Sequence, residues 1–165
     1  AGAGAGTSAE DHNEADVKFA EQMIPHHEGA LEMAKLAPSR AADQRVKDLA
    51  ARIEAAQDPE IKLMQGWLED WGESDAATGG MDHGGGDGDS GMSDQDMGAL
   101  EAASGADFDK MFLTMMVEHH KRAIEMAETE IADGQFPAAL DLARKIKSDQ
   151  ETEITEMQAL AAGLA

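Results

Sequence analysis

Hydrophobic residues recur along the chain with the three-to-four-residue spacing of amphipathic helices. At about 100° per residue, Phe19, Met23 and Ala30 fall on one face of a helix, whereas Glu21 falls on the opposite face. Three further stretches show the same separation, and capping residues, prolines and glycines mark their ends. The pattern predicts helices over residues 16–36, 42–71, 107–131 and 137–160, the first of which ends before Pro38.

The chain contains an internal repeat. Shifting the sequence by 93 positions places the segment Phe19–Ala34 on Phe112–Ala127, and the same offset places residues 49–65 on residues 142–158 without a gap. Each half therefore predicts one helical hairpin. Because neither hairpin can bury its apolar face alone, the predicted fold is all-α, an antiparallel four-helix bundle built from two duplicated hairpins.

The remaining segments define the domain organisation. Residues 1–15 are expected to form a disordered tail, and residues 16–165 a single domain with hairpins at 16–71 and 107–160. Residues 72–98 form a flexible acidic linker by composition, since Gly, Asp and Ser dominate it. A short helix is predicted between Ser93 and Ala103, leading into the second hairpin.

Composition and charge narrow the function. Hydrophobic residues make up 42% of the chain, enough for a core, while 34 acidic against 13 basic residues give a net charge of -21. That charge argues against nucleic acid and anionic membranes as partners. No stretch is apolar enough to insert into a membrane, and the start of the chain lacks the regions of a signal peptide, so the chain as given is expected to be soluble.

Four histidines fall within the predicted apolar faces. They form two adjacent pairs, His26-His27 and His119-His120, at equivalent positions of the repeat. Burying four imidazoles is costly unless a partner satisfies their nitrogen atoms, and a metal ion does so directly. Adjacent ring positions diverge by about 100°, which predicts at least two metal positions related by a pseudo-two-fold axis.

Methionine is the only sulfur-containing residue. The chain has 11 Met and no Cys, which excludes disulfides, zinc fingers, iron–sulfur clusters and thiol nucleophiles. Thioethers beside imidazoles favour Cu(I), while the imidazoles alone also suit Cu(II), and another transition metal stays possible. The predicted metal ligands are Met23, His26, His27, Met33, Met116, His119, His120 and Met126.

Polar residues of the second and fourth helices also point inward. Gln57, Glu60, Gln150 and Glu153 fall among core positions, where they can orient the histidines through the non-ligating nitrogen or serve as ligands themselves. The linker carries Met81, His83 and Met92, which form a candidate outer metal site. Alternatively, each of these residues has only a structural role, as core packing, polar contact or unstructured linker.

The motifs Met23-Ile-Pro-His-His-Glu-Gly-Ala-Leu-Glu-Met-Ala34 and Met115-Met-Val-Glu-His-His-Lys-Arg-Ala-Ile-Glu-Met-Ala127, with Gln57-x-x-Glu-Ile61 and Gln150-x-x-Glu-Ile154, resemble the domain of unknown function 305 family. The resemblance spans Asp16 to Leu160. It implies a ferritin-like fold, a secreted or periplasmic bacterial protein, and an association of some members with copper binding and copper resistance.

These observations leave three candidate functions. The first is an extracytoplasmic copper-binding protein that buffers the metal or passes it to an unidentified delivery partner. The second is a ferritin-like di-metal oxidase, which needs more inward carboxylates than Glu60 and Glu153 supply. The third is a metal-free structural or partner-binding bundle. No nucleophile arrangement or phosphate-binding loop is present, so we expect no enzymatic activity.

Overall fold

The computed structural model describes residues 11–73 and 94–164, and these residues are almost entirely helical. The long helices are α2 (Glu14–Arg40), α3 (Gln44–Asp70), α6 (Gly105–Asp133) and α7 (Pro137–Gly163). A shorter helix, α5 (Asp94–Ala102), precedes α6, as the sequence predicts. The described residues contain no β-strand, only an isolated bridge between Ala41 and Gly105.

Except for the start of α7 at Pro137, every helix end differs from the predicted one by one to four residues, and α2 differs at both of its ends. α2 begins at Glu14, because Asn13 caps it and Asp16 completes a capping box, so the helix extends into the predicted tail. α2 also continues through Pro38 to Arg40, and the prediction that it ends before this proline was wrong. A proline in the last turn removes a single backbone hydrogen bond, and Ala41 N–H still donates to the Ala37 carbonyl.

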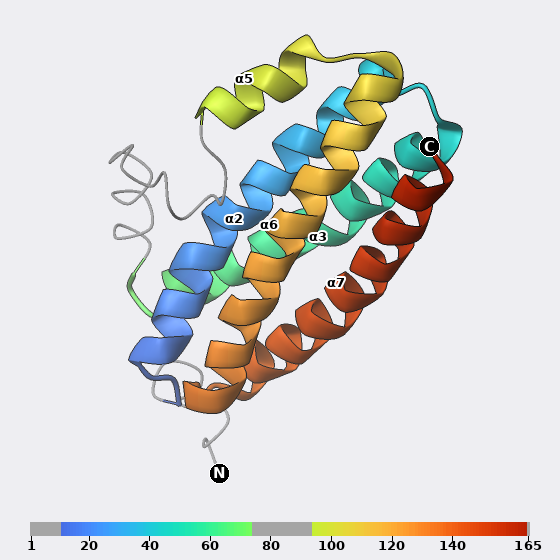
Figure 1. Ribbon diagram of the computed structural model, residues 1–165. Coiled ribbons are helices and arrows are strands. Elements are labelled where there is room, and N and C mark those ends of the chain that lie inside the picture. Colours follow the sequence, from blue (N-terminus) through green and yellow to red (C-terminus); the bar gives the residue numbers. More distant parts are fainter. Residues whose placement is uncertain (1–10, 74–93, 165) are drawn as a thin grey trace.

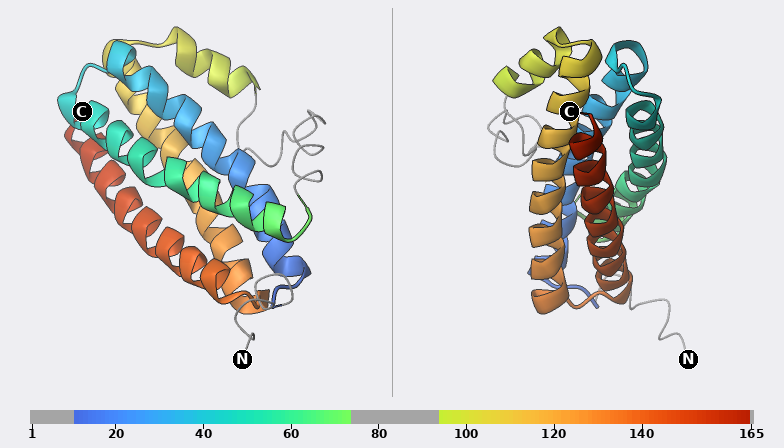
Figure 2. Two further views of the ribbon diagram at one scale, coloured as in Figure 1. Left: turned by 180° about the vertical axis from the view of Figure 1, so that it is seen from behind. Right: turned by 45° about the vertical axis from the view of Figure 1, so that its right-hand side comes forward.

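The helices pack as two hairpins. α2 contacts α3, α6 contacts α7, and α2 and α6 contact each other across the two halves. Figures 1 and 2 show the two helices of each hairpin running in opposite directions, with α5 lying across the end where α6 begins. The histidine pairs lie near the middle of α2 and α6, far from either end of the molecule.

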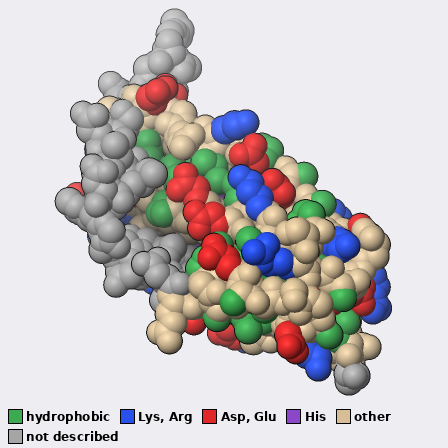
Figure 3. All heavy atoms as spheres, turned by 90° about the horizontal axis from the view of Figure 1, so that it is seen from above, with side chains coloured by type: hydrophobic (Ala, Val, Ile, Leu, Met, Phe, Trp, Pro, Cys, Tyr) green, Lys and Arg blue, Asp and Glu red, His purple; other side chains and the backbone are tan. Residues whose placement is uncertain are grey.

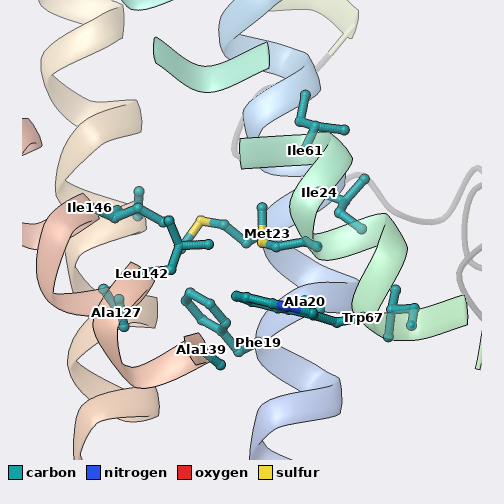
Figure 4. Packing of buried hydrophobic residues seen from close by; sticks show 14 of the residues in the cluster. Phe19, Ala20, Met23, Ile24, Ile61, Trp67, Ala127, Ala139, Leu142 and Ile146 are labelled. Carbon is teal, nitrogen blue, oxygen red and sulfur yellow. The ribbon is translucent and has the colours of Figure 1, made fainter. Parts of the chain in front are cut away.

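Buried hydrophobic residues form two clusters, one toward each end. The first includes Phe19, Met23 and Trp67, which Figure 4 shows lying between the helices with Leu142 and Ile146 of α7. The second includes Phe108, Phe112, Met116 and other residues at the end near α5. On α2 and α6, the histidines occupy positions where one cluster gives way to the other.

Two buried aspartates tie the hairpins together. Asp109 of α6 accepts hydrogen bonds from the backbone N–H groups of Ala42 and Asp43, each at 3.0 Å. Asp16 of α2 accepts from the N–H groups of the residues that correspond to them in the repeat, Gln135 and Phe136, at 3.0 Å. Residues that correspond in the sequence repeat therefore make corresponding tertiary contacts as well.

No helix among the described residues is long and apolar enough to cross a membrane.

Candidate metal centre

The four predicted histidines are all buried. His26 and His120 have no solvent exposure, His27 has 1% and His119 has 4%. Their positions on the hydrophobic faces of α2 and α6 account for this burial, because each helix turns its apolar stripe toward its neighbours. No histidine is visible on the face shown in Figure 3.

His26 and His119 meet where α2 contacts α6. Their rings are stacked, with centroids 3.7 Å apart and planes inclined by 20°. His119 Nε2 lies 2.7 Å from the His26 backbone carbonyl, which can only accept a hydrogen bond, so Nε2 carries the hydrogen. The lone pair of the neutral His119 ring is therefore on Nδ1, which has no partner.

His26 is the least satisfied of the four. Both of its ring nitrogens are buried without a hydrogen-bond partner. Burial, followed by the charge of the neighbouring His119, lowers the pKa of His26 far below its ordinary value. Burial likewise lowers the pKa of His119 to about 4, although its bond to the His26 carbonyl opposes the shift. Both rings are therefore neutral at pH 7, the form in which imidazole binds a metal.

The outer histidine of each pair is held by a glutamate. His27 Nε2 lies 2.7 Å from Glu60 Oε1, and His120 Nε2 lies 2.6 Å from Glu153 Oε1. These contacts are also related by the 93-residue offset. A carboxylate that accepts from Nε2–H fixes the tautomer and leaves Nδ1 with its lone pair, and in His120 this Nδ1 has no partner.

The two glutamates differ in their surroundings. Glu60 is buried and its second oxygen accepts from Lys145 Nζ at 3.3 Å. Glu153 is partly exposed, and the residue of the first half that corresponds to Lys145, Arg52, pairs with Glu156 instead. The two halves therefore share the histidine–glutamate contact and differ in the hydrogen bonds of the equivalent basic residues.

Of the glutamines and methionines predicted for the site, all but Met126 are buried. Gln57 and Gln150 are buried, and the Oε1 atom of each lacks a partner. Met23, Met33 and Met116 have no solvent exposure, whereas Met126 is partly exposed and lines a groove on the surface. Met126 therefore differs from its repeat equivalent, Met33. The predicted outer site at Met81, His83 and Met92 lies outside the described residues.

Several buried nitrogen and oxygen atoms of the predicted site residues lack hydrogen-bond partners. Among residues 11–73 and 94–164, no three His, Asp or Glu side chains are grouped in a metal-binding arrangement. Imidazole lone pairs and amide oxygens that face the interior without partners nevertheless fit a transition metal, because each such buried atom costs about 1–3 kcal/mol while it is unsatisfied. Carboxylates, which hard or oxidase-type metals require, are already engaged by His27 and His120.

Sequence reasoning did not find a second buried polar group, which lies at the opposite end from α5. Glu130 has 1% exposure, and Asp16 beside it already accepts hydrogen bonds from the backbone N–H groups of Asn13, Gln135 and Phe136. Burial, and then its hydrogen bond and charge contact with Asp16, raise the pKa of Glu130 to about 9, so Glu130 is protonated at pH 7. The repeat has Ala37 at the equivalent position, and this departure was the signal available in the sequence.

Comparison with known proteins agrees with the resemblance found in the sequence. The family described as Domain of unknown function (DUF305) matches residues 16–161. A DUF305 protein from Streptomyces coelicolor, assigned as secreted, is 30% identical with a TM-score of 0.78, over 91% of this chain and 93% of that one. A DUF305 fragment from Deinococcus radiodurans, 24% identical over 91% of this chain and 97% of that one, has the same fold, with a TM-score of 0.76.

Structures of CopM are similar as well. In its Cu(I)-bound form CopM is 29% identical to this chain with a TM-score of 0.73, over 90% of this chain and 96% of CopM. CopM also has structures with Cu(II) and with silver bound. No curated protein matches the chain in sequence.

Proposed function

The chain belongs to the DUF305 family, and on this premise we propose that it is a copper-binding protein that acts outside the cytoplasm, where it buffers the metal or passes it on. The observation that carries the proposal is the set of unpartnered ring nitrogens at the contact of α2 and α6, namely both nitrogens of His26 and the Nδ1 atoms of His119 and His120. Neutral imidazoles with free lone pairs bind borderline and soft metals.

The four long helices would act as a ferritin-like antiparallel bundle that holds these ligands rigidly. Cu(I) is favoured because buried thioethers of Met23, Met33 and Met116 occupy the same helices as the histidines, and thioethers prefer soft ions. Glu60 and Glu153 would orient the outer histidines. The similarity to CopM, which binds Cu(I), Cu(II) and silver, supports the choice of metal.

The proposed role is binding and exchange of the metal, without catalysis. Glu60 and Glu153 already engage histidines, which leaves no spare pair of inward carboxylates for a di-metal oxidase among the proposed ligands. A location outside the cytoplasm is supported by the secreted relative from Streptomyces coelicolor.

The test is a titration of metal-free protein with Cu(I) under reducing, anaerobic conditions, with Fe(II) and Zn(II) in parallel. A ligand that binds only the native state raises the melting temperature by mass action, so Cu(I) should raise it most. The double variant His26→Leu/His119→Leu should fold, because leucine removes unsatisfied polar atoms, yet it should lose this response.

His12→Leu serves as the matched control, since this histidine stacks on Trp71 at the end of the molecule and is not a proposed ligand. It should retain the full response to Cu(I). A response to Fe(II) alone would indicate an oxidase. A melting temperature unchanged by every metal would indicate a structural bundle and overturn the proposal.

A further inference from the structure

A surface groove lies between α5 and the first turns of α6. It has a volume of about 660 Å³ and is lined by Met111 and Met115 of α6, by alanines of α5 and of the turn after it, and by the charged residues Asp107 and Lys110. Both methionines are partly exposed, whereas Met23, Met33 and Met116 are buried, and both also pack against the second hydrophobic cluster. This end of the molecule, seen in Figure 3, exposes hydrophobic side chains between acidic and basic ones.

The repeat provides an internal comparison for this groove. At the equivalent positions of α2, 93 residues earlier, Lys18 and Gln22 line a groove of about 450 Å³ together with Met126. The same scaffold therefore accepts a charged and a polar residue where α6 has two methionines. Packing of the repeated helix does not by itself require thioethers at positions 111 and 115.

The placement of the two methionines suits a soft cation. Residues four apart on a helix are neighbours on one face, with Cβ atoms about 5–6 Å apart, so Met111 and Met115 can present two sulfur atoms to one ion. Thioether sulfur selects Cu(I) and similar soft ions over the harder cations that surround the protein. The net charge of -21 raises the local concentration of any cation.

The same face of α6 leads to the histidines. Met111, Met115 and His119 follow one another at four-residue intervals, and His119 is almost fully buried. An ion that reaches His119 must cross from solvent to the interior, and the methionine groove provides soft ligands one and two turns before it.

We propose that Met111 and Met115 form an outer binding site for a soft monovalent metal ion, through which the ion is loaded onto the central histidines. This inference rests on the proposed function for its second step only. Binding at the groove needs the two thioethers alone, and transfer to the interior needs His26 and His119 as well.

The experiment uses the full chain with 13C-labelled methionine methyl groups and with Ag(I) and Cu(I) as probes. At less than one equivalent of either ion, the methyl signals of Met111 and Met115 should shift before or together with the ring signals of His26 and His119. The variant Met111→Leu/Met115→Leu, which keeps the apolar volume, should load the histidines severalfold more slowly, with their final affinity unchanged.

Lys18→Met/Gln22→Met is the matched gain-of-function variant, because it places the same two thioethers at the equivalent positions of α2, in a groove between α2 and α6. It should show new methyl shifts at α2. Loading of the histidines at the wild-type rate in Met111→Leu/Met115→Leu, or methyl signals at 111 and 115 that shift only after the histidines are saturated, would overturn the inference while leaving the proposed function intact.

Failure of the proposed function gives a different result. In His26→Leu/His119→Leu, the methyl shifts at Met111 and Met115 should persist, because the groove binds independently of the interior. If wild-type histidine signals never respond while the groove signals do, the central copper site is wrong and the outer site stands.

Discussion

The hydrogen bond between His119 and the His26 carbonyl sets the chemistry of the central rings. Because the carbonyl can only accept, it fixes the His119 hydrogen on Nε2 and leaves the lone pair of the neutral ring on Nδ1, which has no partner. The reciprocal bond, from His26 to the His119 carbonyl, is absent, since both nitrogens of His26 lack partners. Two residues equivalent in sequence therefore have different hydrogen bonding.

The buried His119 ring predicts an acid-sensitive fold. Burial lowers its pKa from 6.5 to about 4, so between these values the unfolded state binds a proton that the folded state does not. The free energy of unfolding should therefore fall as pH drops from about 6.5 to about 4, by about 3 kcal/mol from this residue. Urea unfolding across this range should show a shallower decrease in His119→Leu.

Carboxylates also titrate at the acid end of this range, so the comparison needs a control. His12→Leu removes a histidine that stacks on Trp71 near the end of the molecule, and it should keep the wild-type slope. An equal slope in wild type and His119→Leu would show that protonation of His119 does not limit acid stability.

At the level of helices and turns, Asp16 and Asp109 accept hydrogen bonds from equivalent interhelical turns but have different neighbours. Asp109 joins the α2–α3 turn to α6, whereas Asp16 joins the α6–α7 turn to α2 and also faces the protonated Glu130. Gly134 leaves space for the Glu130 carboxyl, which a Cβ at that position would contact. The first half has Ala37 and Ala41 at these two positions and no buried acid pair.

The buried pair of Asp16 and Glu130 predicts that the free energy of unfolding decreases at alkaline pH, beginning near the α6–α7 turn. The folded pKa of Glu130 is raised from 4.5 to about 9, so the folded state retains a proton that the unfolded state releases, and stability decreases as pH rises between these values. Glu130→Gln keeps a hydrogen-bond donor for Asp16 and removes the titration. This variant should therefore be more stable than wild type at pH 8.

Tryptophan fluorescence reports directly on the region around Asp16 and Glu130. Trp67 and Trp71 are the only tryptophans, and the chain has no tyrosine whose fluorescence would interfere. Both tryptophans pack against Phe136, whose backbone N–H donates to Asp16. The wild-type emission should change with a midpoint near pH 9, and that of Glu130→Gln should not. Identical alkaline transitions in both proteins would refute the assignment of the proton to Glu130.

For the whole molecule, the excess of negative charge opposes folding. With a net charge of -21, the compact state suffers self-repulsion that added salt screens. The melting temperature should therefore rise as NaCl increases from about 10 mM to about 500 mM, where the Debye length shrinks from about 30 Å to a few ångströms. Differential scanning calorimetry would measure it.

A matched variant separates screening from other effects of salt. Glu69 and Asp70 are exposed at the carboxyl end of α3, where negative charge is unfavourable, and Glu69→Gln/Asp70→Asn reduces the net negative charge by two, from -21 to -19. The variant should melt above wild type at low salt, and the difference should shrink at high salt. A difference independent of salt would exclude repulsion as its cause.

The repeat made much of the fold predictable from the sequence. Periodicity placed the helices, and the repeated His-His pairs correctly predicted four buried imidazoles. The continuation of α2 through Pro38 was not predictable from the sequence, because the destabilisation by a proline depends on how many helical hydrogen bonds it disrupts. The stacking of His26 on His119 and the pairing of Asp16 with Glu130 depend on tertiary contacts, which a helical wheel does not contain.

The duplication within a single chain has a consequence for direction. An assembly of two identical hairpins would carry every special residue twice, once at each end, and an ion would approach it equally from both. In this chain the copies have diverged, so the methionine groove lies at the end with α5, while the acid pair and the tryptophans lie at the other. The two ends of the protein therefore differ in chemistry, so under the proposed function an ion would be received at one end only.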